Sequence, residues 1–208
     1  MGQIGISLGW NCTPATFGVD EKIRERKENG YLTCPFDEMI TNLPGVIKCI
    51  EDDFKDFTNE KYLELIVSEE KVGGIMLNET LIHNTKYNFI FNHESPGHAD
   101  LYKTQSWDGG VNHYIDNNFN LFKERYNQRI QNFKNYIKDS QNLDNIIFIL
   151  SRFNKDVKKL DEVLKQKYPN LKYEILIITP KEGLEMVHGH YRLMKLDNEV
   201  IKNELENI

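Results

Sequence analysis

The chain has few cysteines, no excess of positive charge and no long hydrophobic run. It contains three cysteines among 208 residues, a small and odd number that argues against a disulfide scaffold and favours free thiols. No apolar stretch approaches the roughly 20 residues that a membrane-spanning helix requires, and the first residues lack the basic start and apolar core of a secretory signal. We therefore expect a soluble, cytoplasmic protein that has no membrane partner.

The charge balance is acidic, with a formal net charge of -6 and a pI near 5.6. A nucleic-acid-binding face usually needs a basic surface, so we expect no nucleic-acid partner. Hydrophobic residues make up 39% of the chain and aromatic residues 11%. This composition is sufficient for a packed core, and the length suits a single domain.

Short apolar runs alternate with charged helical patterns along the chain. Residues 4–8, 146–150 and 173–178 are dense in aliphatic side chains and are predicted to be strands. A charged helix is expected at 155–167, between the last two strands, and this β-α-β order is typical of a parallel sheet. The predicted fold is therefore α/β, a mainly parallel central sheet flanked by helices, in a single domain.

Further elements follow from hydrophobic periodicity and from turn residues. Aromatic and aliphatic side chains that recur every three or four residues predict a long amphipathic helix over 117–138. The remaining expected elements are helices at 43–54 and 60–66, strands at 72–77 and 87–92, and a hairpin at 184–196 followed by a short last helix.

Cys12 lies where the first strand is expected to meet the first helix. Asn11 is a favourable helix cap, Pro14 is tolerated in a first turn, and the charged run 20–28 ends at Gly30. The N–H groups and the dipole at a helix N-terminus stabilise a thiolate, so we expect the pKa of Cys12 to be lowered. The alternative is that Cys12 is a small buried residue that closes the first turn.

A thiol nucleophile needs a base, and His93 is the best candidate among six histidines. It directly follows the expected strand 87–92, and strand ends deliver side chains to the edge where helices begin. The other five are interpreted as solvated or packed residues: His83, His98, His113, His188 and His190.

Five ordered sequence blocks resemble the DUF1796 group of papain-like cysteine peptidases. The blocks are ISLGWNCTPA (6–15), CPFDEMI (34–40), FIFNHE (89–94), RYNQRIQNF (125–133) and IFILSR (147–152). By position, the resemblance implies that Cys12 is the nucleophile and His93 the base. It also implies that Asn11 aids oxyanion binding and that Asp37 orients the imidazole, with no cofactor.

Two positions depart from the pattern of that group. Glu38 stands where a bulky aromatic residue is common, and Glu94 stands where an aspartate is usual. The first departure bears on the local pocket, whereas the second keeps a carboxylate in place and matters less.

Three functional hypotheses follow. The leading one is a cysteine hydrolase or acyltransferase that acts on a peptide, amide or ester substrate through a thioester. The second is a non-catalytic binding domain on the same scaffold. The third is a zinc-binding module, although its ligands would match no compact zinc motif. Those ligands would be Cys12, Cys34, His93 and His98.

Overall fold

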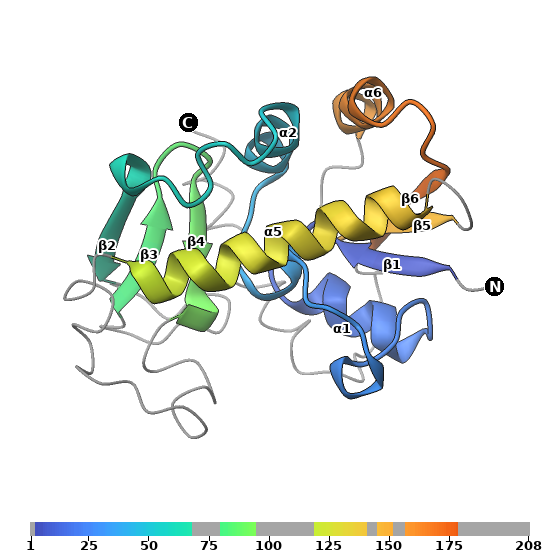
Figure 1. Ribbon diagram of the computed structural model, residues 1–208, viewed down its shortest axis with the longest axis horizontal. Coiled ribbons are helices and arrows are strands. Elements are labelled where there is room, and N and C mark those ends of the chain that lie inside the picture. Colours follow the sequence, from blue (N-terminus) through green and yellow to red (C-terminus); the bar gives the residue numbers. More distant parts are fainter. Residues whose placement is uncertain (1–2, 68–79, 95–118, 141–144, 152–156, 179–208) are drawn as a thin grey trace, which may run out of the picture.

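The fold combines one parallel and one antiparallel sheet with helices (Figure 1). The computed structural model describes residues 3–67, 80–94, 119–140, 145–151 and 157–178. The strands are β1 (Ile4–Ser7), β2 (Leu63–Val67), β3 (Thr80–Asn84), β4 (Phe89–Phe91), β5 (Ile146–Ser151) and β6 (Tyr173–Ile178). The α-helices are α1 (Thr13–Asp20), α2 (Leu43–Glu51), α5 (Asn120–Ser140) and α6 (Lys158–Lys167). Short 3-10 turns are η1 (Lys27–Asn29), η2 (Pro35–Glu38), η3 (Glu60–Tyr62) and η4 (Asn92–Glu94).

The parallel sheet has the strand order β1-β5-β6. Its register places Phe148 of β5 beside Ile6 of β1 and Ile175 of β6. All six residues of the central strand β5 are buried, as expected for an aliphatic run that is covered on both faces. The α/β class and the three predicted strands of this sheet are confirmed.

The antiparallel sheet, with the order β2-β3-β4, was not predicted. The expected helix over 60–66 is wrong, because the chain makes only the turn η3 there before entering β2. Pairing with β3 sets Leu65 beside Ile82, so a partner distant in sequence overrides the local pattern. The expected strand 72–77 and the hairpin 184–196 with its following helix lie outside the described residues.

The first helix is shorter than the sequence predicts. The expected helix runs toward Gly30, but α1 ends at Asp20. The backbone N–H groups of Ile23 and Arg24 both donate to the carbonyl of Gly18, at 2.8 and 3.0 Å, and turn the chain back. Gly30 is left-handed (φ 103°), as a terminating glycine should be, but it ends η1 instead.

Helix α5 lies across both sheets (Figure 1) and confirms the predicted amphipathic helix. Phe122 of α5 packs against Phe91 of the antiparallel sheet, with 4.7 Å between ring centroids. Phe133 packs against Phe148 of the parallel sheet at 6.4 Å. One hydrophobic cluster therefore contains residues of both sheets. Within the described part of the chain, no helix is long and apolar enough to cross a membrane.

Candidate active site

Cys12 follows a tight turn that links the carboxyl end of β1 to α1. Two consecutive residues of this turn are left-handed, Gly9 with φ 83° and Trp10 with φ 79°. A bulky residue rarely adopts this conformation, and Trp10 is 97% buried, so packing holds it there. Strained residues of this kind cluster at active sites, and a sharp strand-to-helix turn is a common position for a nucleophile.

The first turn of α1 orients Cys12 and its neighbours. The side-chain oxygen of Asn11 accepts a hydrogen bond from the backbone N–H of Thr13 at 2.9 Å. The carbonyl of Cys12 accepts the backbone N–H and the hydroxyl of Thr16, at 3.0 and 3.2 Å. Asn11 is buried and Cys12 is half-buried. The side-chain amide of Asn11 is therefore fixed beside the thiol-bearing residue.

The expectation of a lowered pKa for Cys12 is wrong. Burial raises the pKa of the thiol above its usual value, and the carboxylate of Glu38 raises it further. A backbone hydrogen bond at Cys12 acts in the opposite direction and lowers the pKa, but it does not outweigh the loss of hydration. At neutral pH the resting form of Cys12 is therefore the thiol.

His93 lies on η4, directly after β4, at the strand end where the sequence predicts it. The next residue, Glu94, is buried, and its two carboxylate oxygens accept from Nη1 of Arg125 on α5 at 2.9 and 3.0 Å. This charge-assisted pair attaches η4 to α5. The carboxylate that replaces the aspartate of the family pattern thus holds the turn that carries His93.

Glu38 is a residue whose electrostatic role the sequence interpretation missed. Its carboxylate accepts from Nη2 of Arg129 on α5 at 2.7 Å and also binds Lys27 of η1. Burial alone would raise the pKa of Glu38, but Arg129 and Lys27, with a further contribution from His93, lower it to about 2. Because the same carboxylate raises the pKa of Cys12, it lies within electrostatic range of both predicted catalytic residues.

A signal for Glu38 was present in the sequence. Two adjacent carboxylates, Asp37 and Glu38, directly follow a Cys-Pro-Phe segment. Proline at the start of such a segment favours a tight turn, and in a 3-10 turn consecutive side chains diverge by about 120°. The two acids of η2 therefore cannot face the same partners.

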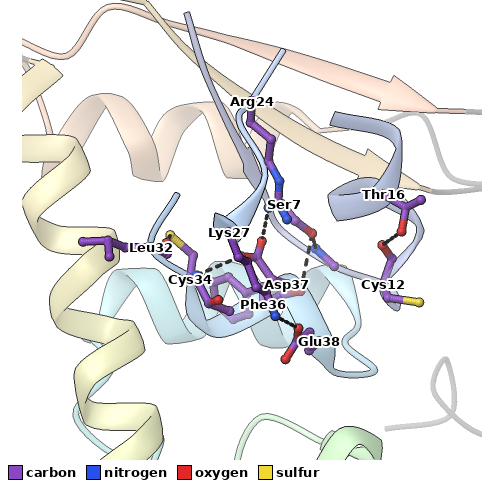
Figure 2. Close-up of polar contacts among 12 residues, drawn as sticks. Ser7, Cys12, Thr16, Arg24, Lys27, Leu32, Cys34, Phe36, Asp37 and Glu38 are labelled. Carbon is purple, nitrogen blue, oxygen red and sulfur yellow. Dashed lines mark hydrogen bonds and ion pairs between the residues drawn. The ribbon is translucent and has the colours of Figure 1, made fainter. Parts of the chain in front are cut away.

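Asp37 points away from Glu38 and into the protein (Figure 2). Its Oδ1 accepts from Nη1 of Arg24 at 2.8 Å, and its Oδ2 accepts from the backbone N–H of Cys34 at 2.8 Å. Burial lowers the pKa of Arg24, but Asp37, together with Tyr31 and Cys34, raises it above its ordinary value, so the guanidinium stays charged. The prediction that Asp37 orients the imidazole of His93 stays a prediction, and both carboxylate oxygens have these other donors.

The three cysteines are free. Cys34 is fully buried, and its thiol donates weakly to the carbonyl of Leu32 at 3.8 Å. Cys12 and Cys34 lie on opposite sides of η2 (Figure 2), an arrangement that does not favour a shared metal. Among the described residues, no group of three or more potential metal ligands gathers, and His98 lies outside them.

Comparison with known protein families gives a match to most of the chain. The family model described as "Putative papain-like cysteine peptidase (DUF1796)" matches residues 3–183. No curated protein and no solved structure matches the chain. The matched segment includes the Cys12 turn, η2, η4 and α5. Because the match extends over most of its length, the chain belongs to the DUF1796 family.

Proposed function

We propose that the protein is a cysteine-dependent hydrolase or acyltransferase that acts on a peptide, amide or ester bond. The observation that carries this proposal is the placement of Cys12 on a strained strand-to-helix turn, within electrostatic range of the same carboxylate as His93. Cys12 follows a strand of the parallel sheet and His93 follows a strand of the antiparallel sheet, and the two residues are about 80 positions apart in sequence.

The proposed reaction begins when His93 removes the proton from the Cys12 thiol as sulfur attacks the substrate carbonyl carbon. A tetrahedral oxyanion forms and collapses to a thioester, and the imidazolium returns the proton to the departing amine or alcohol. His93 then deprotonates a water molecule, which attacks the thioester and releases the acid and the free thiol. If an amine or alcohol attacks instead of water, the same steps transfer the acyl group.

Asn11 is proposed to stabilise the oxyanion. Its side-chain oxygen is engaged by the N–H of Thr13, and this bond leaves the NH₂ end of the amide in a fixed direction beside Cys12. A preorganised donor of this kind contributes most where water is excluded, and Asn11 is only 6% exposed. Asp37 keeps its proposed role of orienting His93.

The raised pKa of Cys12 implies that its thiol loses the proton only during the attack on the substrate. A preformed thiolate–imidazolium pair is not the resting state, so His93 must act as a general base during the attack. The same raised pKa is the observation that favours the second candidate function, a binding domain that retains the scaffold without catalysis.

The test uses p-nitrophenyl acetate, an activated ester, with intact-mass spectrometry and peptide mapping. We expect a burst of p-nitrophenol and an acetyl group on Cys12, both of which are lost in Cys12→Ser. His93→Ala should slow acetylation by about 10²-fold or more, because general-base assistance contributes that much. The matched control is Cys49→Ser, which removes a fully buried thiol of α2 and should leave the burst unchanged.

The two candidate functions give different results. If Cys12 is alkylated by iodoacetamide but is neither acetylated nor affected by His93→Ala, the catalytic proposal is wrong. That result would support the binding domain.

A further inference from the structure

The turn before Cys12 is held by hydrogen bonds to every backbone polar group of Leu8, Gly9 and Trp10. Three of these six groups are bound by one residue, Thr41. Its hydroxyl accepts from the N–H of Trp10 at 2.8 Å and donates to the carbonyl of Leu8 at 3.3 Å. Its own N–H donates to the carbonyl of Trp10 at 2.8 Å.

The other three groups are bound by the parallel sheet and by β1 itself. The N–H of Leu8 and the carbonyl of Gly9 bond to the backbone of β5, and the N–H of Gly9 bonds to the hydroxyl of Ser7. Thr41 is thus the only residue from outside the sheet that bonds to the backbone of Leu8–Trp10 among the described residues.

Thr41 also approaches the turn too closely for any residue but glycine at position 9. A Cβ atom placed on Gly9 would overlap the hydroxyl oxygen of Thr41 and would lie 2.8 Å from its methyl carbon. Thr41 is 1% exposed, so it has no free space in which to retreat. The left-handed turn and Thr41 therefore fit together as one packed unit.

The residue before Thr41 bonds to the strand that carries His93. The N–H of Ile40 donates to the carbonyl of Ile90 at 2.8 Å, and the N–H of Ile90 donates back at 3.0 Å. Ile90 lies in β4, which leads directly into η4 and His93. Two adjacent residues, Ile40 and Thr41, thus connect the Cys12 turn to the His93 strand through backbone and hydroxyl hydrogen bonds.

We infer that Thr41 is a positioning residue that sets the distance and orientation between Cys12 and His93. This inference rests on the proposed function, in which these two side chains exchange a proton. Without the hydroxyl, the N–H of Trp10 and the carbonyl of Leu8 lose a buried partner, and the strained turn is free to relax. A displacement of about 1 Å at a reacting group lowers a rate by up to about 10²-fold.

The experiment compares Thr41→Val, which has nearly the same shape but no hydroxyl, with Thr41→Ser, which keeps the hydroxyl. The readout is the rate at which p-nitrophenyl acetate acetylates Cys12, measured below the melting temperature of each variant. We expect Thr41→Val to slow acetylation by about tenfold or more and Thr41→Ser to stay within about threefold of the unmodified protein. In the Thr41→Val background, His93→Ala should cause a much smaller further decrease than it does alone.

The matched control is Thr58→Val, which removes a hydroxyl that donates to Asn127 at 2.9 Å on the exposed surface. This variant should leave the acetylation rate unchanged. Equal rates in Thr41→Val, Thr41→Ser and the unmodified protein would overturn the inference. If Thr41→Val does not fold, Thr41→Ala replaces it in the comparison. If Thr41→Ala is also unfolded while Thr41→Ser is folded, the hydroxyl is needed for the fold alone, and the inference is overturned.

Failure of the proposed function gives a different pattern. In that case Cys12 is not acetylated in any variant, or His93→Ala has no effect. The pH profile of Cys12 alkylation by iodoacetamide then tests the position of the turn by itself. If the pH profile of alkylation is shifted in Thr41→Val but unchanged in Thr41→Ser, relative to the unmodified protein, the positioning role is supported. Identical profiles in all three proteins contradict it.

Discussion

The two acidic residues of η2 are adjacent in sequence, but their side chains face different parts of the molecule and bind different partners. Asp37 is 1% exposed. It binds the guanidinium of Arg24, which lies just after α1, and the backbone N–H of Cys34, at the start of its own turn. The side chain of Glu38 is 20% exposed and binds cations from η1 and α5. Asp37 therefore closes a local structure, whereas Glu38 connects segments and acts electrostatically on Cys12 and His93.

This difference shows that two acids of the same sequence motif can have different roles. The Pro-Phe-Asp block directs attention to Asp37, but partners and solvent access decide what a carboxylate does. A fully buried ion pair depends on both of its members. A partly exposed carboxylate with two cations acts on its neighbours through its charge, and it tolerates the loss of one contact better.

The largest effect is expected from Arg24→Met, which removes the cation that pairs with Asp37. Among the donors in the described part of the chain, the buried carboxylate would keep only the N–H of Cys34, and the free energy of unfolding should fall by about 3–5 kcal/mol at pH 7. The loss should be smaller at pH 5, because a carboxyl without its cation takes up a proton and then needs no counter-charge. Urea denaturation at both pH values measures this.

The control for this prediction is Lys165→Ala. The ion pair of Lys165 with Asp161 is shorter, at 2.5 Å, but the lysine side chain is 69% exposed. An exposed pair of this spacing contributes only about 0.3–0.5 kcal/mol. Equal losses in Arg24→Met and Lys165→Ala would contradict the view that burial makes the Asp37 pair important.

An intermediate effect is expected from the acid titration of Glu38. Its pKa in the folded protein is about 2, below the ordinary value of 4.5, so the ionised form stabilises the fold above pH 4.5. That contribution, about 3 kcal/mol, is lost as the pH falls from 4.5 toward 2. Glu38→Gln should therefore be less stable at pH 7 and show a weaker pH dependence in this range.

The matched control for the acid titration is Glu51→Gln, which changes an exposed acid at the end of α2. Thermal melting curves between pH 2 and 5 give the measurement. If Glu38→Gln and the unmodified protein lose stability in parallel over this range, the low pKa of Glu38 is wrong.

The smallest effect concerns the reactivity of Cys12. Glu38 raises the pKa of this thiol, so Glu38→Gln should lower that pKa and speed alkylation at pH 7 by about two- to fivefold. Asp37→Asn should change the alkylation rate less, provided that the variant is folded. Rates of iodoacetamide labelling, mapped to Cys12, measure both. A larger response to Asp37→Asn than to Glu38→Gln would reverse the comparison of the two acids.

The parallel sheet was predictable because its strands are continuous aliphatic runs. Such runs indicate buried strands even when the strands that pair with them are unknown. The sequence did not predict β2, since Leu65 lies in a strand only through its pairing with Ile82 of β3. The early end of α1 was equally hidden. It depends on a backbone reversal at Gly18 that brings Arg24 to Asp37, and neither partner identifies the other by spacing.

The placement of the candidate site was also predictable in part. Cys12 and His93 lie at element ends, which local patterns mark, and both lie where the sequence places them. The direction of the Cys12 pKa was predicted wrongly, because burial of the thiol and the proximity of Glu38 arise only after the elements pack. Thr41 was missed for the same reason, since its contacts with the turn link residues more than 30 positions apart.

Helix α5 anchors two separate turns of the candidate site. Arg125 and Arg129 are one helical turn apart, and they bind Glu94, the residue after His93, and Glu38, which interacts electrostatically with both predicted catalytic residues. A small sliding motion of the helix would carry both anchored turns in the same direction and leave their mutual spacing almost unchanged. Unwinding of that one turn would release both anchors together, so on heating the two anchored turns should lose their attachment to α5 in a single event.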